Sequence, residues 1–174
     1  QGAMYVVAGE ELAAHQRGDS LVRFRQAVRW FEERLRNDPA NRAHQTWLAQ
    51  AYLGLGDWKA AERWLSIVDA KGPPRLFIRG LLATLAARRG DSAGAVRLLG
   101  PGPTAGHVDG EFLVYEARLA ALRGDREEAI AKLSTALRLG VNNFHWVQHA
   151  VRQDFAAMAG DARYRKLMGL EGGR

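Results

Sequence analysis

Apolar residues recur along this chain at intervals of three or four, in short stretches that come in pairs. The spacing is clearest on either side of Gly56. The apolar positions there are Leu48, Ala51, Tyr52 and Leu55 before the glycine, and Ala61, Trp64, Leu65 and Val68 after it. An apolar stripe with this period predicts two amphipathic helices joined by a tight turn.

The same pattern extends over most of the chain and predicts an all-α protein, with no strand. Ten helices are expected in five antiparallel pairs, which lie near residues 5–36, 42–70, 75–99, 110–139 and 143–169. The separate helices run over residues 5–17 and 20–36, 42–55 and 58–70, 75–89 and 92–99, 110–123 and 126–139, and 143–158 and 161–169.

A Gly-Asp dipeptide marks the turn within each pair. It begins at residues 18, 56, 90, 124 and 160, so the intervals are 38, 34, 34 and 36 residues. Glycine ends a helix well because it adopts left-handed backbone angles without a Cβ clash. Aspartate then caps the next helix by accepting hydrogen bonds from its first N–H groups. Asp125 and Glu128 have the spacing of a capping box.

Three of these dipeptides follow an arginine and so form Arg-Gly-Asp, at residues 17–19, 89–91 and 123–125. That tripeptide is also a cell-adhesion signal. Here we interpret it as helix punctuation, meaning that it ends one helix and caps the next. The aspartate is expected to be occupied as the cap, and the tripeptide is expected to lie in a tight turn.

Small and apolar residues repeat in step with the Gly-Asp pairs. An alanine lies seven residues before three of the glycines, another lies four residues after the paired aspartates, and a leucine follows four residues later. The positions are Ala49, Ala83 and Ala117, then Ala61, Ala95 and Ala129, then Leu65, Leu99 and Leu133. Small residues on both sides of a turn let two helices approach closely, and leucine fills the space between neighbouring pairs.

A 34-residue unit of this kind resembles the tetratricopeptide repeat family. The resemblance is carried by "WLAQAYLGLGDWKAAERWLSIVDAKGPP", residues 47–74, and by "EARLAALRGDREEAIAKLSTALRLGVNN", residues 116–143. It implies an α-solenoid of helix pairs wound into a right-handed superhelix, forming one domain over residues 5–174. Residues 1–4 look like a cloning remnant.

Two regions depart from the repeat. The first pair has Glu11 and Arg23 at the alanine positions, so we expect Ala27 and Phe31 to take the packing roles in a longer second helix. The third pair is cut short by "GPGPTAGHVDG", residues 100–110, which predicts an irregular connector or, as the alternative, a functional loop. The closing segment, residues 154–168, is similar to those that end repeat arrays in some bacterial regulators. That likeness suggests a bacterial protein or the C-terminal domain of a larger one.

Composition narrows the function classes. No apolar run is long enough to cross a membrane, and the absence of cysteine excludes disulfides and thiolate zinc sites. The net charge of +6 comes from 21 Arg and 4 Lys scattered among 19 acids, which favours a solvated surface. It also motivates the alternative function, a nucleic-acid-binding helical-repeat protein.

Motifs for catalysis are missing from the sequence. It contains no phosphate loop, nucleophile elbow or His-Glu-x-x-His motif. His145 and His149 share one face of a predicted helix, but two ligands do not make a metal site. We therefore expect no enzyme, no cofactor and no metal. Trp58 and Trp64 lie at helical spacing beside the repeat alanines, which is typical of core residues. All five tryptophans are therefore expected in the core rather than on a surface that stacks nucleic-acid bases.

The first helices of stacked pairs line the concave side of a solenoid, and ligands of the resembled family usually lie there. We therefore expect a protein scaffold that binds a peptide or partner protein in that groove. The expected lining residues are His15, Gln16, Thr46, Gln50, Leu53, Phe77, Thr84, Arg88, Val114, Arg118 and Leu122. Arg88 and Arg118 are the strongest candidates, since guanidinium groups on a groove wall grip carboxylates. Chaperone-binding members of the resembled family grip a C-terminal carboxylate with lysines and asparagines on the first helices. Here the lysines and asparagines lie elsewhere, so a site of that kind is not expected. We expect a cytoplasmic protein, with the periplasm as the alternative; the partner and oligomeric state are left open.

Overall fold

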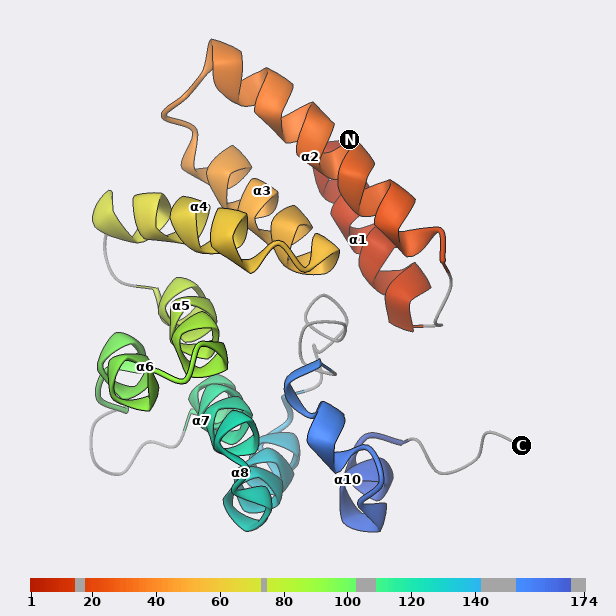
Figure 1. Ribbon diagram of the computed structural model, residues 1–174, viewed down its shortest axis with the longest axis vertical. Helices are drawn as coiled ribbons and strands as arrows, with labels where there is room; N and C mark the ends of the chain where they lie inside the picture. Colours follow the sequence, from red (N-terminus) through yellow and green to blue (C-terminus); the bar gives the residue numbers. More distant parts are fainter. Residues whose placement is uncertain (15–17, 73–74, 103–108, 142–152, 170–174) are drawn as a thin grey trace. The chain divides into compact units, whose positions relative to one another are not determined.

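The computed structural model describes residues 1–14, 18–72, 75–102, 109–141 and 153–169 of the 174-residue chain. Over these residues the chain is helical, with turns between the helices and no strand (Figure 1). The all-α prediction is confirmed. The helices are α1 (Gly2–Ala14), α2 (Ser20–Asn37), α3 (Arg42–Leu55), α4 (Trp58–Ala70), α5 (Leu76–Arg88), α6 (Ser92–Leu99), α7 (Gly110–Arg123), α8 (Arg126–Arg138), the short 3-10 helix η2 (Ala156–Met158) and α10 (Ala162–Leu167).

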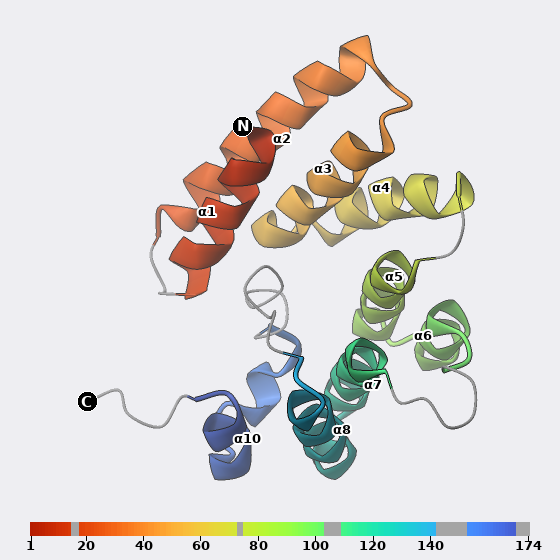
Figure 2. The same cartoon turned by 180° about the vertical axis from the view of Figure 1, so that it is seen from behind.

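The described residues fall into two compact units. The first takes in residues up to Ile78 and so contains α1 to α4. The second begins at Arg79 and contains most of α5, together with α6, α7, α8, η2 and α10. Two sequential pairs pack as antiparallel hairpins in both views, α1 with α2 in the first unit and α7 with α8 in the second (Figures 1 and 2).

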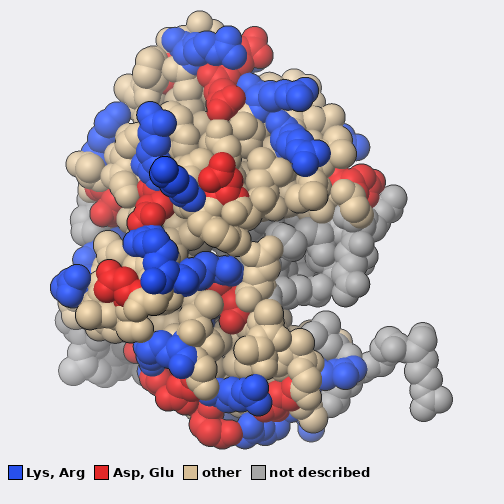
Figure 3. All heavy atoms as spheres, viewed as in Figure 1, with Lys and Arg blue, Asp and Glu red and all other residues tan. Residues whose placement is uncertain are grey.

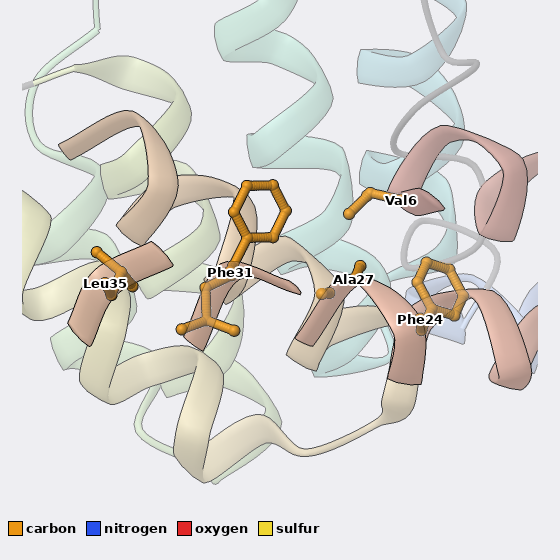
Figure 4. Packing of buried hydrophobic residues seen from close by; sticks show 7 residues of the cluster. Val6, Phe24, Ala27, Phe31 and Leu35 are labelled. Carbon is orange, nitrogen blue, oxygen red and sulfur yellow. The ribbon is translucent and has the colours of Figure 1, made fainter. Parts of the chain in front are cut away.

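The first unit has its core around α2. Phe24, Ala27, Phe31 and Leu35 lie on one face of that helix and are buried, together with Val6 of α1 (Figure 4). Apolar residues three or four apart share a helix face, so α2 presents a continuous stripe to α1 and α3. The expected packing roles of Ala27 and Phe31 are confirmed, since they are 0% and 1% exposed.

A glycine lets two helices of this core approach closely. A Cβ atom placed on Gly54 of α3 would lie 2.4 Å from the ring of Phe24 on α2. That is closer than two carbon atoms can approach, so the ring takes the space that any other residue would fill. Gly54 therefore explains how the bulky Phe24 is 0% exposed at a helix crossing.

The small and apolar residues that repeat in step are buried in both units. None of the nine is more than 6% exposed, and most are fully enclosed. The predicted burial is therefore confirmed at Ala49, Ala61, Leu65, Ala83, Ala95, Leu99, Ala117, Ala129 and Leu133.

The Gly-Asp turns of the three central pairs have the predicted geometry. Gly56, Gly90 and Gly124 have φ angles of 75°, 83° and 84°. The carboxylates that follow accept hydrogen bonds from backbone N–H groups three residues on, at 3.0 Å for Asp57 to Ala60, 2.7 Å for Asp91 to Gly94 and 3.1 Å for Asp125 to Glu128. The interpretation of Arg-Gly-Asp as helix punctuation is confirmed at residues 89–91 and 123–125.

Two details of the turn prediction are wrong. Asp19 has right-handed helical backbone angles, and its side chain makes no cap hydrogen bond. An N-cap carboxylate reaches its donor from extended or bridging angles, which this residue does not adopt. Glu128 does not complete a capping box, because its carboxylate instead accepts a hydrogen bond from Arg123 Nη2 at 2.9 Å.

The ends of the chain also differ from the expectation. Helix α1 begins at Gly2 rather than at residue 5, and a Cβ on Gly2 would meet the ring of Trp30. Residues 2–4 are therefore helical, and Gly2 lies against Trp30 of α2. The first closing helix was expected over 143–158; residues 142–152 lie outside the described residues, and the short helix η2 follows them.

Candidate functional site

The first helices of the second unit are buried on nearly every side. In α5 the six consecutive residues from Leu81 to Ala86 are all buried. In α7 the five from Ala117 to Ala121 are buried as well. A helix enclosed all round belongs to the interior, so α5 and α7 do not present an open wall along their length.

This burial corrects the predicted groove. Of the nine expected lining residues that the structure describes, five are buried: Gln50 at 8% exposure, Leu53 at 6%, Thr84 at 2%, Val114 at 7% and Arg118 at 2%. A buried side chain cannot meet a partner without a rearrangement. The four that stay partly exposed are Thr46, Phe77, Arg88 and Leu122. His15 and Gln16 lie outside the described residues.

The two predicted threonines use their hydroxyl groups within their own helices. Thr46 Oγ1 donates to the carbonyl oxygen of Arg42 at 2.8 Å, and Thr84 Oγ1 donates to that of Gly80 at 2.8 Å. Such a bond to the preceding turn satisfies the hydroxyl group inside the helix. Neither donor is therefore held ready for a ligand.

An aspartate of the closing segment holds both of the arginines predicted for the groove. Arg118 Nε donates to Asp154 Oδ2 at 2.6 Å, and the two side chains are 2% and 0% exposed. Arg88 Nη2 lies 2.5 Å from Asp154 Oδ1, in ion-pair contact without the alignment of a hydrogen bond. The carboxylate thus lies between two cations from two different helices.

The surroundings of this pair are apolar and aromatic. The guanidinium of Arg118 lies 5.3 Å from the ring centre of Tyr115, which is itself buried. Burial raises the pKa of the Tyr115 hydroxyl to about 12, although the positive charge of Arg118 lowers it in part. Gly80 of α5 accommodates the same ring, since a Cβ there would lie 2.4 Å from it. In these surroundings neither the Arg118 charge nor the Asp154 charge is solvated by water, so each is stabilised by the other.

Arg118 is consequently a structural residue of the second unit rather than a partner-binding one. A paired buried charge costs little only while its partner remains in place, which ties α7 to the closing segment. Asp154 was not predicted from the sequence. It lies 36 residues from Arg118, so no helical periodicity connects the two.

The comparisons with known proteins agree with the repeat pattern. A tetratricopeptide repeat family model matches residues 42–66 and 77–101. The first match covers α3 and part of α4, and the second covers most of α5 and all of α6. Both matched segments are therefore tetratricopeptide repeats. No curated protein and no solved structure matches it.

The described residues contain no group of three or more His, Cys, Asp or Glu side chains placed to hold a metal ion. His145 and His149 fall outside that part of the chain. Trp30, Trp47 and Trp64 pack partly buried against the core of the first unit, as expected, and Trp58 is also partly buried. No described helix is both long and apolar enough to cross a membrane.

Charge is mixed on the face that Figure 3 shows. Lys and Arg side chains are spread among Asp and Glu, without a continuous basic stripe on that face. A protein that follows a nucleic-acid backbone gathers its cations along one track. The visible face therefore gives no support to the alternative of nucleic-acid binding.

Proposed function

We propose that this chain is a non-enzymatic scaffold whose repeats bind a peptide or a partner protein. Tetratricopeptide repeats generally mediate protein–protein interaction. The observation that carries the proposal is the repeat itself. The family model matches two repeats, at residues 42–66 and 77–101, and each contains a Gly-Asp turn described above. Conserving such a helix-pair framework while varying the accessible side chains is how repeat proteins acquire partners.

We further propose that the partner contacts the accessible side chains of the first helices. In the first unit these include Phe77 at the start of α5. In the second unit they are Arg88 at the end of α5 and Leu122 at the end of α7. Aromatic and arginine side chains contribute strongly to interfaces, because each combines a large contact area with few rotatable bonds or several donors. Arg88 keeps 20% of its side chain exposed while Asp154 holds it in position.

Site-specific photo-crosslinking tests the placement. A benzoylphenylalanine at position 77 replaces one aromatic ring by another, and the same group at Val96 provides a control on the second helix α6, where the side chain is 57% exposed. We expect a cellular protein to be captured from position 77 and not from position 96. Capture from both or from position 96 alone would place the interface elsewhere.

Affinity measurements with the captured protein then test the energetics. By calorimetry, Phe77→Ala should weaken binding about tenfold or more, as expected for an aromatic anchor, whereas Val96→Ala should leave it unchanged. Circular dichroism of each variant shows whether the fold is retained. Equal affinities for parent and Phe77→Ala would contradict the proposed surface. A parallel titration with single-stranded RNA at low salt tests the alternative function, whose driving force is greatest there.

A further inference from the structure

A groove lies between α8 and α10 on the second unit, away from the first helices. Its volume is about 600 Å³, and its lining residues are Ile130, Ser134, Leu137, Arg138, Arg163, Lys166 and Leu167. Two faces of helix α8 are in contact with other structure or line a groove. Ala129, Leu133 and Ala136 are buried on one of them, while Ile130, Ser134 and Leu137 line the groove. The groove therefore runs along an apolar face of α8 that its own hairpin with α7 does not cover.

The opposite wall is held in place by packing and by charge. Tyr164 of α10 is 3% exposed and stacks on Phe155, with ring centres 5.4 Å apart. Arg163 donates to both carboxylate oxygens of Glu127 on α8, at 2.8 and 2.9 Å, and also pairs with Asp161. Hydrogen bonding from Arg163 lowers the pKa of Glu127 and of Asp161. Both carboxylates thus stay ionised around Arg163, and the positive charge of this lining residue is already balanced.

Two other cations on the groove are not balanced in this way. Arg138 Nη2 donates to the neutral hydroxyl of Thr135, and Lys166 is exposed. Neither forms an ion pair with a carboxylate among the described residues, and none of the seven lining residues is acidic. The groove thus combines an aliphatic floor, formed by Ile130, Leu137 and Leu167, with a positively charged rim.

We propose that this groove binds an acidic amphipathic helix of a partner protein. Ile130 and Leu137 are seven residues apart, so they lie about 10 Å apart along α8. Apolar residues at positions i, i+3 or i+4, and i+7 of a partner helix cover the same span, and this spacing is typical of helices that bind in grooves. Glutamates flanking that stripe would face Arg138 and Lys166.

The chemistry of the lining selects this occupant over other anionic ones. A single-stranded nucleic acid needs aromatic side chains on which its bases stack, and the lining contains none. Attraction to an anionic membrane typically needs a cluster of about four to eight basic residues, more than this rim offers. The surface is separate from the one proposed for the first helices, so either proposal can fail alone.

Titration of the full chain with a designed peptide tests the inference. The probe is a fluorescein-labelled helical peptide of 15 residues with leucine at groove spacing and glutamate on both flanks. A matched peptide carries lysine at every glutamate position. Fluorescence anisotropy should show saturable binding of the acidic peptide, at least about tenfold tighter than the lysine peptide at low salt. Equal affinity, or no saturation by the acidic peptide, would overturn the proposal.

Adjacent residues of α10 supply a matched pair of variants. Lys166→Glu reverses a charge on the groove, and Arg165→Glu reverses an exposed charge one residue away that does not line it. We expect Lys166→Glu to weaken binding about fivefold and Arg165→Glu to change it less than twofold. Equal losses would show general attraction to a basic surface and would contradict a defined groove.

Nuclear magnetic resonance then locates the bound peptide. Amide shifts should be concentrated in α8 and α10, and Phe77→Ala should leave both shifts and affinity unchanged. Shifts confined to α5 and α7, or loss of binding in Phe77→Ala, would assign the acidic peptide to the first helices instead. Displacement of the peptide from α8 and α10 by single-stranded RNA would indicate a nucleic-acid site and overturn the proposal.

Discussion

Two ion pairs join the closing segment to the α7–α8 hairpin, and their surroundings could hardly differ more. Arg118 with Asp154 and Arg163 with Glu127 are each 36 residues apart in sequence, and each includes a hydrogen bond shorter than 3 Å. The first pair is 2% and 0% exposed, whereas the second is 53% and 78% exposed.

The contrast shows that contact geometry alone does not determine what an ion pair does. In the interior a charge that loses its partner cannot be solvated, so removing one member is costly. At the surface, water and salt replace the lost partner, and the same change costs little. The buried pair therefore belongs to the fold, and the exposed pair orients a groove wall.

The largest effect should come from Asp154→Ala. This change leaves Arg118 buried without its carboxylate, so we expect the free energy of unfolding to fall by about 3–5 kcal/mol. Urea denaturation followed by circular dichroism measures it. A loss below about 1 kcal/mol would mean that water reaches Arg118, and the distinction between the two pairs would fail.

An uncharged change in the same unit separates the effect of charge from that of packing. Ala95 is 1% exposed, so Ala95→Leu must push its neighbours aside. We expect a loss of about 1–3 kcal/mol, smaller than that of Asp154→Ala. Thermal melting of the two variants provides the ranking. A variant that melts like the parent would show that residue 95 does not lie at a tight helix crossing.

Removing an exposed carboxylate that has a structural role should cost an intermediate amount of stability, less than Asp154→Ala and more than a change at the exposed ion pair. Asp125 is exposed, yet it caps α8 through the N–H of Glu128. Replacing it by alanine should cost about 1 kcal/mol, the usual value for an N-cap. Urea denaturation of Asp125→Ala checks this value. Asp125→Asn, which keeps an accepting oxygen, is the control and should lose much less.

The smallest effect should come from Glu127→Ala at the exposed pair. Because Arg163 lowers the pKa of Glu127, the pair stabilises the fold at pH values above the ordinary pKa of glutamate. That contribution should vanish as the pH falls through the lowered pKa, and also in about 1 M salt, where charges are screened within about 3 Å. Melting curves at neutral and acid pH, with and without salt, test this. A difference between parent and variant that persists at low pH would show that Glu127 acts through packing.

Much of the fold could be predicted because its causes are local or periodic. The Gly-Asp turns combine a residue that tolerates positive φ with one that caps a helix, and the repeated alanines mark helix crossings whatever the partner. The expected start of α1 at residue 5 was too late, because Gly2 has no side chain whose pattern shows burial. It is the absence of a Cβ that lets Gly2 pack against Trp30.

The candidate site was predicted less well for a physical reason. Register identifies which residues of α5 face inward, but it does not show what lies opposite them. One signal was available, since the nearly uninterrupted apolar run from Leu81 to Ala86 is typical of a helix enclosed on all sides. The role of Asp154 had no such signal, because only the folded chain brings it to Arg88 and Arg118. The α8–α10 groove likewise depends on how two distant segments pack.

The central claim is that the buried ion pair with Asp154 makes Arg118 a structural residue. A pair of double-mutant cycles tests this claim most directly. One cycle combines Arg118→Met with Asp154→Leu, and the other combines Arg163→Met with Glu127→Leu, each followed by urea denaturation. The account predicts a strong coupling for the buried pair that is unaffected by salt, with the double variant more stable than the Asp154→Leu single variant. It predicts a weak coupling for the exposed pair that disappears in salt. Equal couplings for the two pairs, or a buried coupling that salt abolishes, would contradict it.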